Sequence, residues 1–281
     1  MDLLFIGFGY SSSFIYERLK HGASSIAATT RSEEKAETLT CKGVRPIMFD
    51  GSSTSSELKD ALDSASHIIM SAGPSADGDP FLTASGQVPT PSLVWVGYLS
   101  TIGVYGNHDG AWVDETVAPA PRSTRSKNRL AVEQAWQAYA EARGAGCMIA
   151  RLSGIYGPGR SPLERVRSGK ARRIIKEGQI FNRIHGEDIG RVVSRAAIQN
   201  WSGIMNVTDD EPEAAATVLE HAASLLGIDP PPAVAFEDAE MNDMARSFYS
   251  ESKRASNALS KREFGPYLYP TYREGLASLL S

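Results

Sequence analysis

A short apolar run that ends in two closely spaced glycines, at the start of the chain, most constrains its fold. Residues 3–6 read as a buried strand, Gly7 and Gly9 follow at once, and residues 14–19 continue as an amphipathic helix. A strand that passes into a helix through a glycine turn is typical of the first unit of a βαβ fold. The rest of the chain is then expected to supply parallel strands, with helices on both faces of the sheet.

Strand-like and helix-like segments alternate after this first unit. Apolar runs that predict strands occupy residues 25–30, 44–49, 67–70, 93–99 and 148–152. Amphipathic runs that predict helices occupy residues 31–40, 57–62 and 129–143, and Ser32 stands in the N-cap position of the first. Residues 71–91 are rich in Gly, Ser, Asp and Pro, which predicts a loop with at most a short helix.

The pattern changes after Gly154. The next elements are a predicted hairpin over residues 172–184 turning at 177–179, a helix over 188–199 and a strand over 204–207 that returns to the sheet. From Pro212 the chain is mostly helical, with a break at the prolines 230–232. We therefore predict an α/β fold, a Rossmann-type doubly wound parallel sheet with a small C-terminal α-rich lobe.

The same patterns predict where the domains lie. The dinucleotide-binding Rossmann domain is expected to span residues 1–155 and about 181–208. The small substrate lobe is expected to span residues 156–180 and 209–281.

Charge and cysteine content exclude several classes of function. The formal net charge of the 281 residues is −4, whereas nucleic-acid-binding domains are usually basic, so we expect no nucleic-acid partner. No apolar stretch is long enough to span a membrane, and the first apolar run leads directly into the fold, so a cytoplasmic protein is expected. Cys41 and Cys147 lie far apart and have no metal-ligand spacing, so we expect neither a disulfide nor a metal site.

The glycine turn matches the fingerprint of dinucleotide-binding proteins. It reads Gly7-Phe8-Gly9-Tyr10-Ser11-Ser12, with Ser12 in the third glycine place. Gly7 permits the tight turn and Gly9 lets the backbone approach a pyrophosphate, which the N-terminal amides of the following helix also attract. The alternative is a glycine turn that binds no ligand. The position of the turn, between a strand and a helix, favours the cofactor site.

The end of the second strand favours NADP over NAD, although NAD stays possible. NAD-binding relatives of this motif place Asp or Glu there to hold the ribose hydroxyls, whereas this chain has Thr30, Arg31 and Ser32. A carboxylate would repel a ribose 2′-phosphate, and a guanidinium could bind one. The alternative is that Arg31 is a solvated residue at the start of a helix.

Four further segments resemble those of a known superfamily. They are residues 98–106 (YLSTIGVYG), 151–160 (RLSGIYGPGR), 182–189 (NRIHGEDI) and 205–212 (MNVTDDEP). With the glycine turn, they make the chain resemble the short-chain dehydrogenase/reductase superfamily, in its extended NAD-dependent epimerase/dehydratase branch. The resemblance covers roughly residues 1–212, and the order of the segments makes it specific.

The resemblance implies roles for single residues. Thr101 takes the place of the catalytic Ser or Thr that hydrogen-bonds the reacting oxygen. Asp50 takes the place of the adenine contact, and Ile155 lies where the family wraps the nicotinamide. Three residues after the fourth strand take the place of the loop that passes the cofactor: Ser71, Ala72 and Gly73.

The chain departs from the family at the Tyr-x-x-x-Lys motif. Arg125 stands in the tyrosine place and Arg129 in the lysine place. Tyrosine acts as an acid or base because a neighbouring cation lowers its pKa, whereas arginine does not exchange its proton in that range. The implied catalytic set is therefore Thr101, Arg125 and Arg129. Arg129 could still hold the ribose hydroxyls, and Arg125 could bind an anionic substrate or a cofactor phosphate.

Two functions stay open on these residues. The first is an NADP-dependent oxidoreductase or epimerase-like enzyme that acts on a sugar nucleotide or small carbonyl compound, as a monomer or homodimer. The second is a non-catalytic NADP-binding sensor or scaffold. His185 is a possible substitute proton donor, although the segment 185–188 could equally be structural, with Asp188 at a helix start. A basic cluster between Arg160 and Arg173 could attract an anionic substrate or be a solvated face.

Overall fold

The computed structural model describes residues 1–280 and divides the chain into two compact units. The first unit comprises residues 1–101, 124–151 and 189–205, and the second comprises residues 102–123, 152–188 and 206–281, of which 281 lies outside the described part. The second unit thus includes residues 102–123, 152–155, 181–188 and 206–208, which the sequence patterns assign to the dinucleotide-binding domain.

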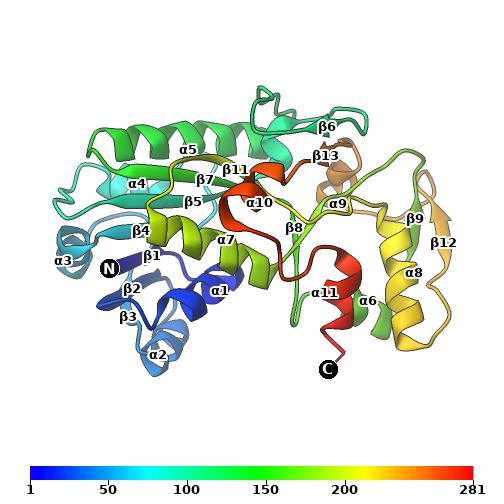
Figure 1. The fold of residues 1–281 in the computed structure, drawn as a ribbon, viewed down its shortest axis with the longest axis horizontal. Coiled ribbons are helices and arrows are strands. Elements are labelled where there is room, and N and C mark those ends of the chain that lie inside the picture. Colours follow the sequence, from blue (N-terminus) through cyan, green and yellow to red (C-terminus); the bar gives the residue numbers. More distant parts are fainter. Residues whose placement is uncertain (281) are drawn as a thin grey trace. The chain divides into compact units, whose positions relative to one another are not determined.

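A seven-stranded sheet is the centre of the first unit (Figure 1). Its strands, in sheet order, are β3 (Arg45–Met48), β2 (Ser25–Thr30), β1 (Asp2–Ile6), β4 (His67–Met70), β5 (Trp95–Thr101), β7 (Gly146–Leu152) and β11 (Gly203–Val207). The pairings of β1 with β2 and β4, of β2 with β3 and of β4 with β5 are parallel. The order reverses between β1 and β4, so this is the topological switch point, outside which open α/β sheets bind ligands.

Helices cover both faces of this sheet, which confirms the doubly wound Rossmann-like fold. They are α1 (Tyr10–Leu19), α2 (Glu33–Cys41), α3 (Ser56–Ser64), α4 (Pro80–Ser85), α5 (Thr124–Glu141) and α7 (Gly186–Gln199). Apolar residues of α3, α4 and α5 pack on one face, around Trp136. On the other face, α1 packs against β1 through edge-to-face contacts of Phe8 with Phe5 and Tyr16.

Local sequence explains where the helices around the candidate site begin. Ser32 is the N-cap of α2, as predicted, and its hydroxyl accepts a hydrogen bond from the Lys35 amide. Asp79 caps α4 in the same way, with Pro80 in the first helical turn. Helix α5 begins at Thr124, five residues before the predicted start, so Arg125 lies in its first turn.

The second unit contains short strands and helices. Its elements are a 3₁₀ turn (Ile102–Tyr105), β6 (Trp112–Val113), β8 (Gly154–Tyr156), α6 (Pro162–Arg167), β9 (Arg173–Ile175), β10 (Arg183–His185), α8 (Ala215–Leu226), β12 (Ala233–Ala235), α9 (Asp243–Phe248), β13 (Arg254–Ala255), α10 (Ala258–Phe264) and α11 (Tyr272–Ala277). Its core gathers apolar residues of α6, α8 and α11 around Tyr156 and Tyr272.

The predicted hairpin over residues 172–184 is wrong. A turn forms near Gly178, but β9 pairs in parallel with β12, and β10 pairs in parallel with β8. Each strand has its partner elsewhere in the chain, and a local apolar pattern does not encode that choice. Within residues 1–280, no helix has the length and apolar character needed to cross a membrane.

Candidate functional site

The glycine turn after β1 has the backbone that the sequence pattern requires. Gly7 has a φ of +78°, and a Cβ atom there would lie 3.1 Å from the Cβ of Ala72, so a side chain would be both strained and crowded. Its amide donates to the Thr29 hydroxyl at 2.8 Å. At Gly9, by contrast, an added Cβ would meet no protein atom within 4 Å. The turn therefore leaves open space beside Gly9.

Two serine hydroxyls fasten this turn to the loop after β4. Ser12, in the third glycine place, is fully buried and its hydroxyl donates to the hydroxyl of Ser71 at 2.8 Å. The Ser71 hydroxyl donates in turn to the carbonyl oxygen of Gly7 at 2.8 Å. The serine in the third place therefore contributes its hydroxyl to a buried link between the turn after β1 and the loop after β4.

The N-terminus of α1 faces this turn without a side-chain cap. Its N-cap is Gly9, which makes no side-chain hydrogen bond, and the first turn contains no acidic residue. Phe8 points into the core, so only its backbone borders the turn, and the Tyr10 ring packs edge-on against Phe14. Ser11 is half-buried. An uncapped helix N-terminus offers its amides and its positive dipole end to an anion.

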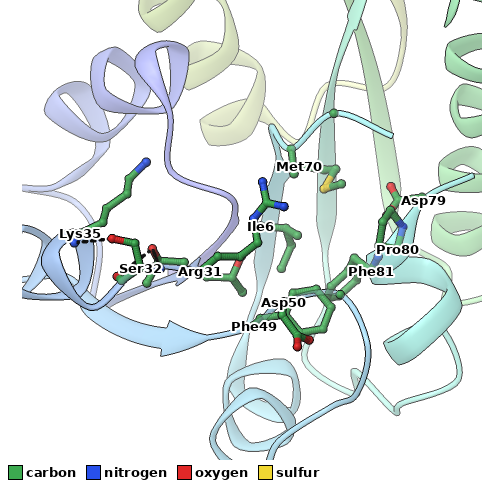
Figure 2. Close-up of a pocket in the computed structure, with 15 residues that line it drawn as sticks. Ile6, Arg31, Ser32, Lys35, Phe49, Asp50, Met70, Asp79, Pro80 and Phe81 are labelled. Atoms are coloured by element: carbon green, nitrogen blue, oxygen red, sulfur yellow. Dashed lines mark hydrogen bonds between the residues drawn. The ribbon is translucent and has the colours of Figure 1, made fainter. Parts of the chain in front are cut away.

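A pocket of about 370 Å³ opens at the carboxyl ends of β1, β2, β3 and β4 (Figure 2). Six predicted site residues line it: Thr30, Arg31, Ser32, Asp50, Ala72 and Gly73. The sequence analysis missed nine others: Ile6, Thr29, Lys35, Phe49, Gly51, Met70, Asp79, Pro80 and Phe81. The pocket lies on the switch-point side of the sheet, entirely within the first unit.

One rim of the pocket is cationic. Arg31 directly follows β2 and Lys35 lies in the first turn of α2, and both line the pocket (Figure 2). Both side chains are exposed. The Thr30 hydroxyl accepts from the Ser32 amide at 3.3 Å, which fixes the connection between them. Because Arg31 precedes the N-cap of α2, helical spacing does not relate it to Lys35, and only the folded pocket shows that both line the same rim.

The two carboxylates that line the pocket already have hydrogen-bond donors. Asp50 accepts from the amide and the hydroxyl of Ser52, which lower its pKa, so it is ionised. Asp79 is buried and accepts from the amides of Phe81 and Leu82 and, at 2.7 Å, from the indole of Trp136. Burial raises the pKa of Asp79 above its ordinary value.

Arg129 is the predicted catalytic residue that the structure fixes most firmly. Its Nη1 donates to the Tyr98 hydroxyl at 3.2 Å and to the Leu99 carbonyl at 3.1 Å. Its Nη2 would lie 3.8 Å from a Cβ atom added to Gly73, so the guanidinium spans the ends of β4 and β5. Burial raises the pKa of Tyr98 to about 12, so Tyr98 stays protonated and donates or accepts as a neutral hydroxyl.

Thr101 and Arg125 both belong to the first unit, on β5 and α5. Thr101 is the last residue of β5 and is half-buried. Arg125 is exposed and precedes Arg129 by four residues on α5.

A buried ion pair lies under these residues. Arg151 on β7 and Glu133 on α5 are each at most 2% exposed, and Arg151 Nη2 is 2.8 Å from Glu133 Oε2. The hydroxyl of Ser100, next to Thr101, donates to Glu133 Oε1. This network ties α5, β5 and β7 together beneath the end of the sheet. Sequence reasoning missed it because the partners come from three separate segments.

His185 is better explained as a structural residue than as a proton donor. It is buried in the second unit, where its ring contacts the rings of Tyr156 and Tyr269, and its Nδ1 accepts from the Glu187 amide. Burial lowers its pKa to about 4, so the imidazole is neutral at neutral pH. Asp188 lies in the first turn of α7 and accepts from the amides of Leu268 and Tyr269.

Two remaining predictions concern Ile155 and metal binding. Ile155 is half-buried on β8 of the second unit. Among residues 1–280, no three His, Cys, Asp or Glu side chains gather in a way that could hold a metal ion. Cys41 and Cys147 are both free thiols.

Comparison with known proteins finds a family model that matches part of the sequence and solved structures that share the fold. The sequence model described as the NAD dependent epimerase/dehydratase family matches residues 93–193. None of the curated protein sequences matches the chain. A solved structure of a functionally unknown conserved protein from Silicibacter pomeroyi DSS is 41% identical, covers 99% of this chain and 97% of that chain, and has a TM-score of 0.88.

More distant solved structures share the fold. UDP-glucuronic acid 4-epimerase from Bacillus cereus, in complex with NAD, is 16% identical over 99% of this chain and 96% of that chain, with a TM-score of 0.75. A dTDP-glucose 4,6-dehydratase double mutant from Streptomyces venezuelae, with NAD bound, is 18% identical over 100% of this chain and 96% of that chain, with a TM-score of 0.76.

Proposed function

Because the chain belongs to the NAD-dependent epimerase/dehydratase family of short-chain dehydrogenases/reductases, we propose that it binds NADP and uses it in an oxidoreductase or epimerase-like reaction. The substrate is a small carbonyl compound or a sugar nucleotide. The observation that carries the proposal is the pocket at the ends of β1 to β4, with its cationic rim. The uncapped N-terminus of α1 does not line this pocket but follows β1, one of the strands at whose end it opens.

The residues of the first unit fit a dinucleotide. Gly9 has open space where a pyrophosphate must approach the backbone, and Gly7 holds the turn against Ala72. Phe49 and Phe81 give the pocket apolar surface for an adenine, beside Asp50. In this proposal the cofactor runs along the loop formed by Ser71, Ala72 and Gly73, and Arg129 lies next to Gly73.

The cationic rim supports NADP rather than NAD. Arg31 and Lys35 can pair with a ribose 2′-phosphate, whose charge a carboxylate at this place would repel. The relatives from Bacillus cereus and Streptomyces venezuelae are described with NAD, so the choice of NADP rests on this chain's own residues.

The residues beyond the pocket support chemistry on a carbonyl. The cofactor supplies a hydride acceptor or donor. In this proposal Thr101 hydrogen-bonds the reacting oxygen, Arg129 holds the ribose hydroxyls from its fixed position at Tyr98 and Leu99, and Arg125 faces the substrate. Since both arginines stay protonated, neither serves as the acid or base that tyrosine provides in the family.

A non-catalytic NADP sensor is the second candidate. The observation that favours it is the same replacement of tyrosine and lysine by Arg125 and Arg129.

Turnover distinguishes the two candidates. The protein is incubated with NADPH or NADP and a panel of sugar nucleotides and small carbonyl acids, and the absorbance of the reduced nicotinamide is followed. We expect turnover with at least one compound, and loss of most of it in Thr101→Val with the NADPH affinity unchanged. Tight NADPH binding with no turnover across the panel would contradict the enzyme and support the sensor.

A further inference from the structure

The segment that leads into α5 is strongly basic. Residues 122–129 carry four positive side chains and no acidic one, on a chain whose net charge is −4: Arg122, Arg125, Lys127 and Arg129. Helix α5 begins within this segment, and its first turn contains no acidic residue. Cations at a helix N-terminus are opposed by the helix dipole, and like charges four residues apart repel each other. The arrangement costs stability, which a bound anion would offset.

Two of these side chains share one face of α5. Arg125 and Arg129 are four residues apart, so they project from one face of α5, one turn from each other. Arg129 is fixed against Tyr98 and Leu99 of β5 and beside Gly73 after β4. Arg125 lies one turn before Arg129 on α5, and α5 contacts β5, whose last residue is Thr101. Open α/β sheets bind their ligands outside these carboxyl ends.

The protein leaves donors of both guanidinium groups unused. Among residues 1–280, no carboxylate forms an ion pair with Arg125 or Arg129. Arg129 Nε is a buried atom without an acceptor, which is costly unless a ligand supplies one. Asp79 interacts with the charge of Arg129, but its carboxylate already accepts hydrogen bonds from Phe81, Leu82 and Trp136.

Resting on the proposed function, we infer that Arg125 and Arg129 bind a carboxylate carried by the substrate next to its reacting carbonyl. The substrate is then an α-keto acid or a compound with that grouping. A guanidinium pairs with a planar carboxylate through two parallel hydrogen bonds, and two guanidiniums on one helix face surround it. A neutral sugar ring at this place would leave both charges without a counterion.

The test measures binding of oxamate, a carboxylate beside an amide carbonyl, to the protein saturated with NADPH. Oxamide, which has the same shape without the charge, is the matched ligand. Arg125→Gln removes the proposed contact, and Lys127→Gln is the control, because Lys127 is exposed at the same helix end but two residues on, and so projects from the opposite side. NADPH affinity is measured separately for each protein.

We expect oxamate to bind the wild-type complex and Arg125→Gln to weaken it by roughly tenfold or more, with Lys127→Gln and the NADPH affinities unchanged. Oxamide is expected to bind at least roughly tenfold more weakly than oxamate. If oxamate fails to bind, or binds Arg125→Gln equally well, the inference is wrong while the cofactor proposal stands. If Arg125→Gln weakens NADPH instead, Arg125 serves a cofactor phosphate and the substrate assignment is wrong. A wild-type protein that binds no NADPH would overturn the proposed function itself.

Discussion

At the scale of single residues, the proposed preference for NADP depends on two cations at the pocket rim, Arg31 and Lys35. Arg31→Ala and Lys35→Ala are each expected to weaken NADPH by roughly tenfold or more, because each removes a charge-assisted hydrogen bond to the 2′-phosphate. NADH should change by less than twofold, since it lacks that phosphate. Calorimetric titration of both cofactors checks this. Lys42→Ala, an exposed lysine at the far end of α2, is the control. Equal losses of affinity for NADPH and NADH would contradict the assignment of Arg31 and Lys35 to the 2′-phosphate.

The two glycines of the first turn are expected to respond differently to a methyl group. Gly9→Ala adds a Cβ into open space, so the free energy of unfolding should change by less than about 1 kcal/mol while NADPH binding falls at least roughly tenfold. Gly7→Ala places a Cβ 3.1 Å from Ala72 at a φ of +78°, so it should cost about 2 kcal/mol of stability or more. Urea unfolding and calorimetry of both variants measure this. A Gly9→Ala protein with unchanged NADPH affinity would place the pyrophosphate elsewhere.

Single residues could be predicted from the sequence where their position in a motif determines the local backbone conformation. Gly7 lies in the predicted tight turn, where it has a positive φ, and Ser32 is the predicted N-cap of α2. Lys35 was missed because its relevance depends on helix α2 presenting it on the same side as Arg31. The motif predicts that Ser12 occupies the third glycine place. It does not predict the hydrogen bond from Ser12 to Ser71, because Ser71 lies in a loop 59 residues away in the sequence.

At the scale of elements, the buried pair of Glu133 and Arg151 is expected to hold α5 against β5 and β7. Arg151→Met leaves the Glu133 carboxylate buried without its counterion, so the free energy of unfolding should fall by about 3–5 kcal/mol. Arg151→Met combined with Glu133→Gln should lose less than the sum of the two single variants, because the neutral amide needs no counterion. A double-mutant cycle in urea measures the coupling, and strictly additive losses would mean that the pair contributes nothing as a pair.

The strands and helices of the sheet could be predicted from local pattern, whereas the small strands of the second unit could not. Strands β2 and β4 have the predicted bounds, since apolar runs between turns define a buried parallel strand. Strands β9 and β10 are only three residues long and pair with distant β12 and β8. A local sequence pattern favours pairing of neighbouring strands in a hairpin. The actual partners, β12 and β8, come together only in the folded chain.

At the scale of the whole molecule, buried ionisable groups tie stability to pH. His185 has a pKa lowered by burial from 6.5 to about 4, so the folded chain binds fewer protons there than the unfolded chain. The contribution of His185 to the free energy of unfolding is fully present above pH 6.5. It falls by about 3 kcal/mol as the pH is lowered toward 4. Asp209 acts in the opposite direction: burial raises its pKa to about 8, so its contribution is lost as the pH rises from 3.8 to 8.

The effect of His185 is isolated by comparing the wild type with His185→Phe. The wild type should lose more stability than the variant between neutral pH and pH 4, by an amount approaching about 3 kcal/mol, because phenylalanine has no proton to bind. Urea unfolding at a series of pH values measures both curves, and Asp209 contributes equally to each. Parallel curves would show that His185 is not buried in its neutral form.

The central claim is that the pocket at the ends of β1 to β4 selects NADP through its cationic rim. Calorimetric titration of the wild-type protein with NADPH and NADH tests it most directly. We predict that NADPH binds at least roughly tenfold more tightly than NADH, since only NADPH places a phosphate between Arg31 and Lys35. Equal affinities, or tighter binding of NADH, would contradict the account.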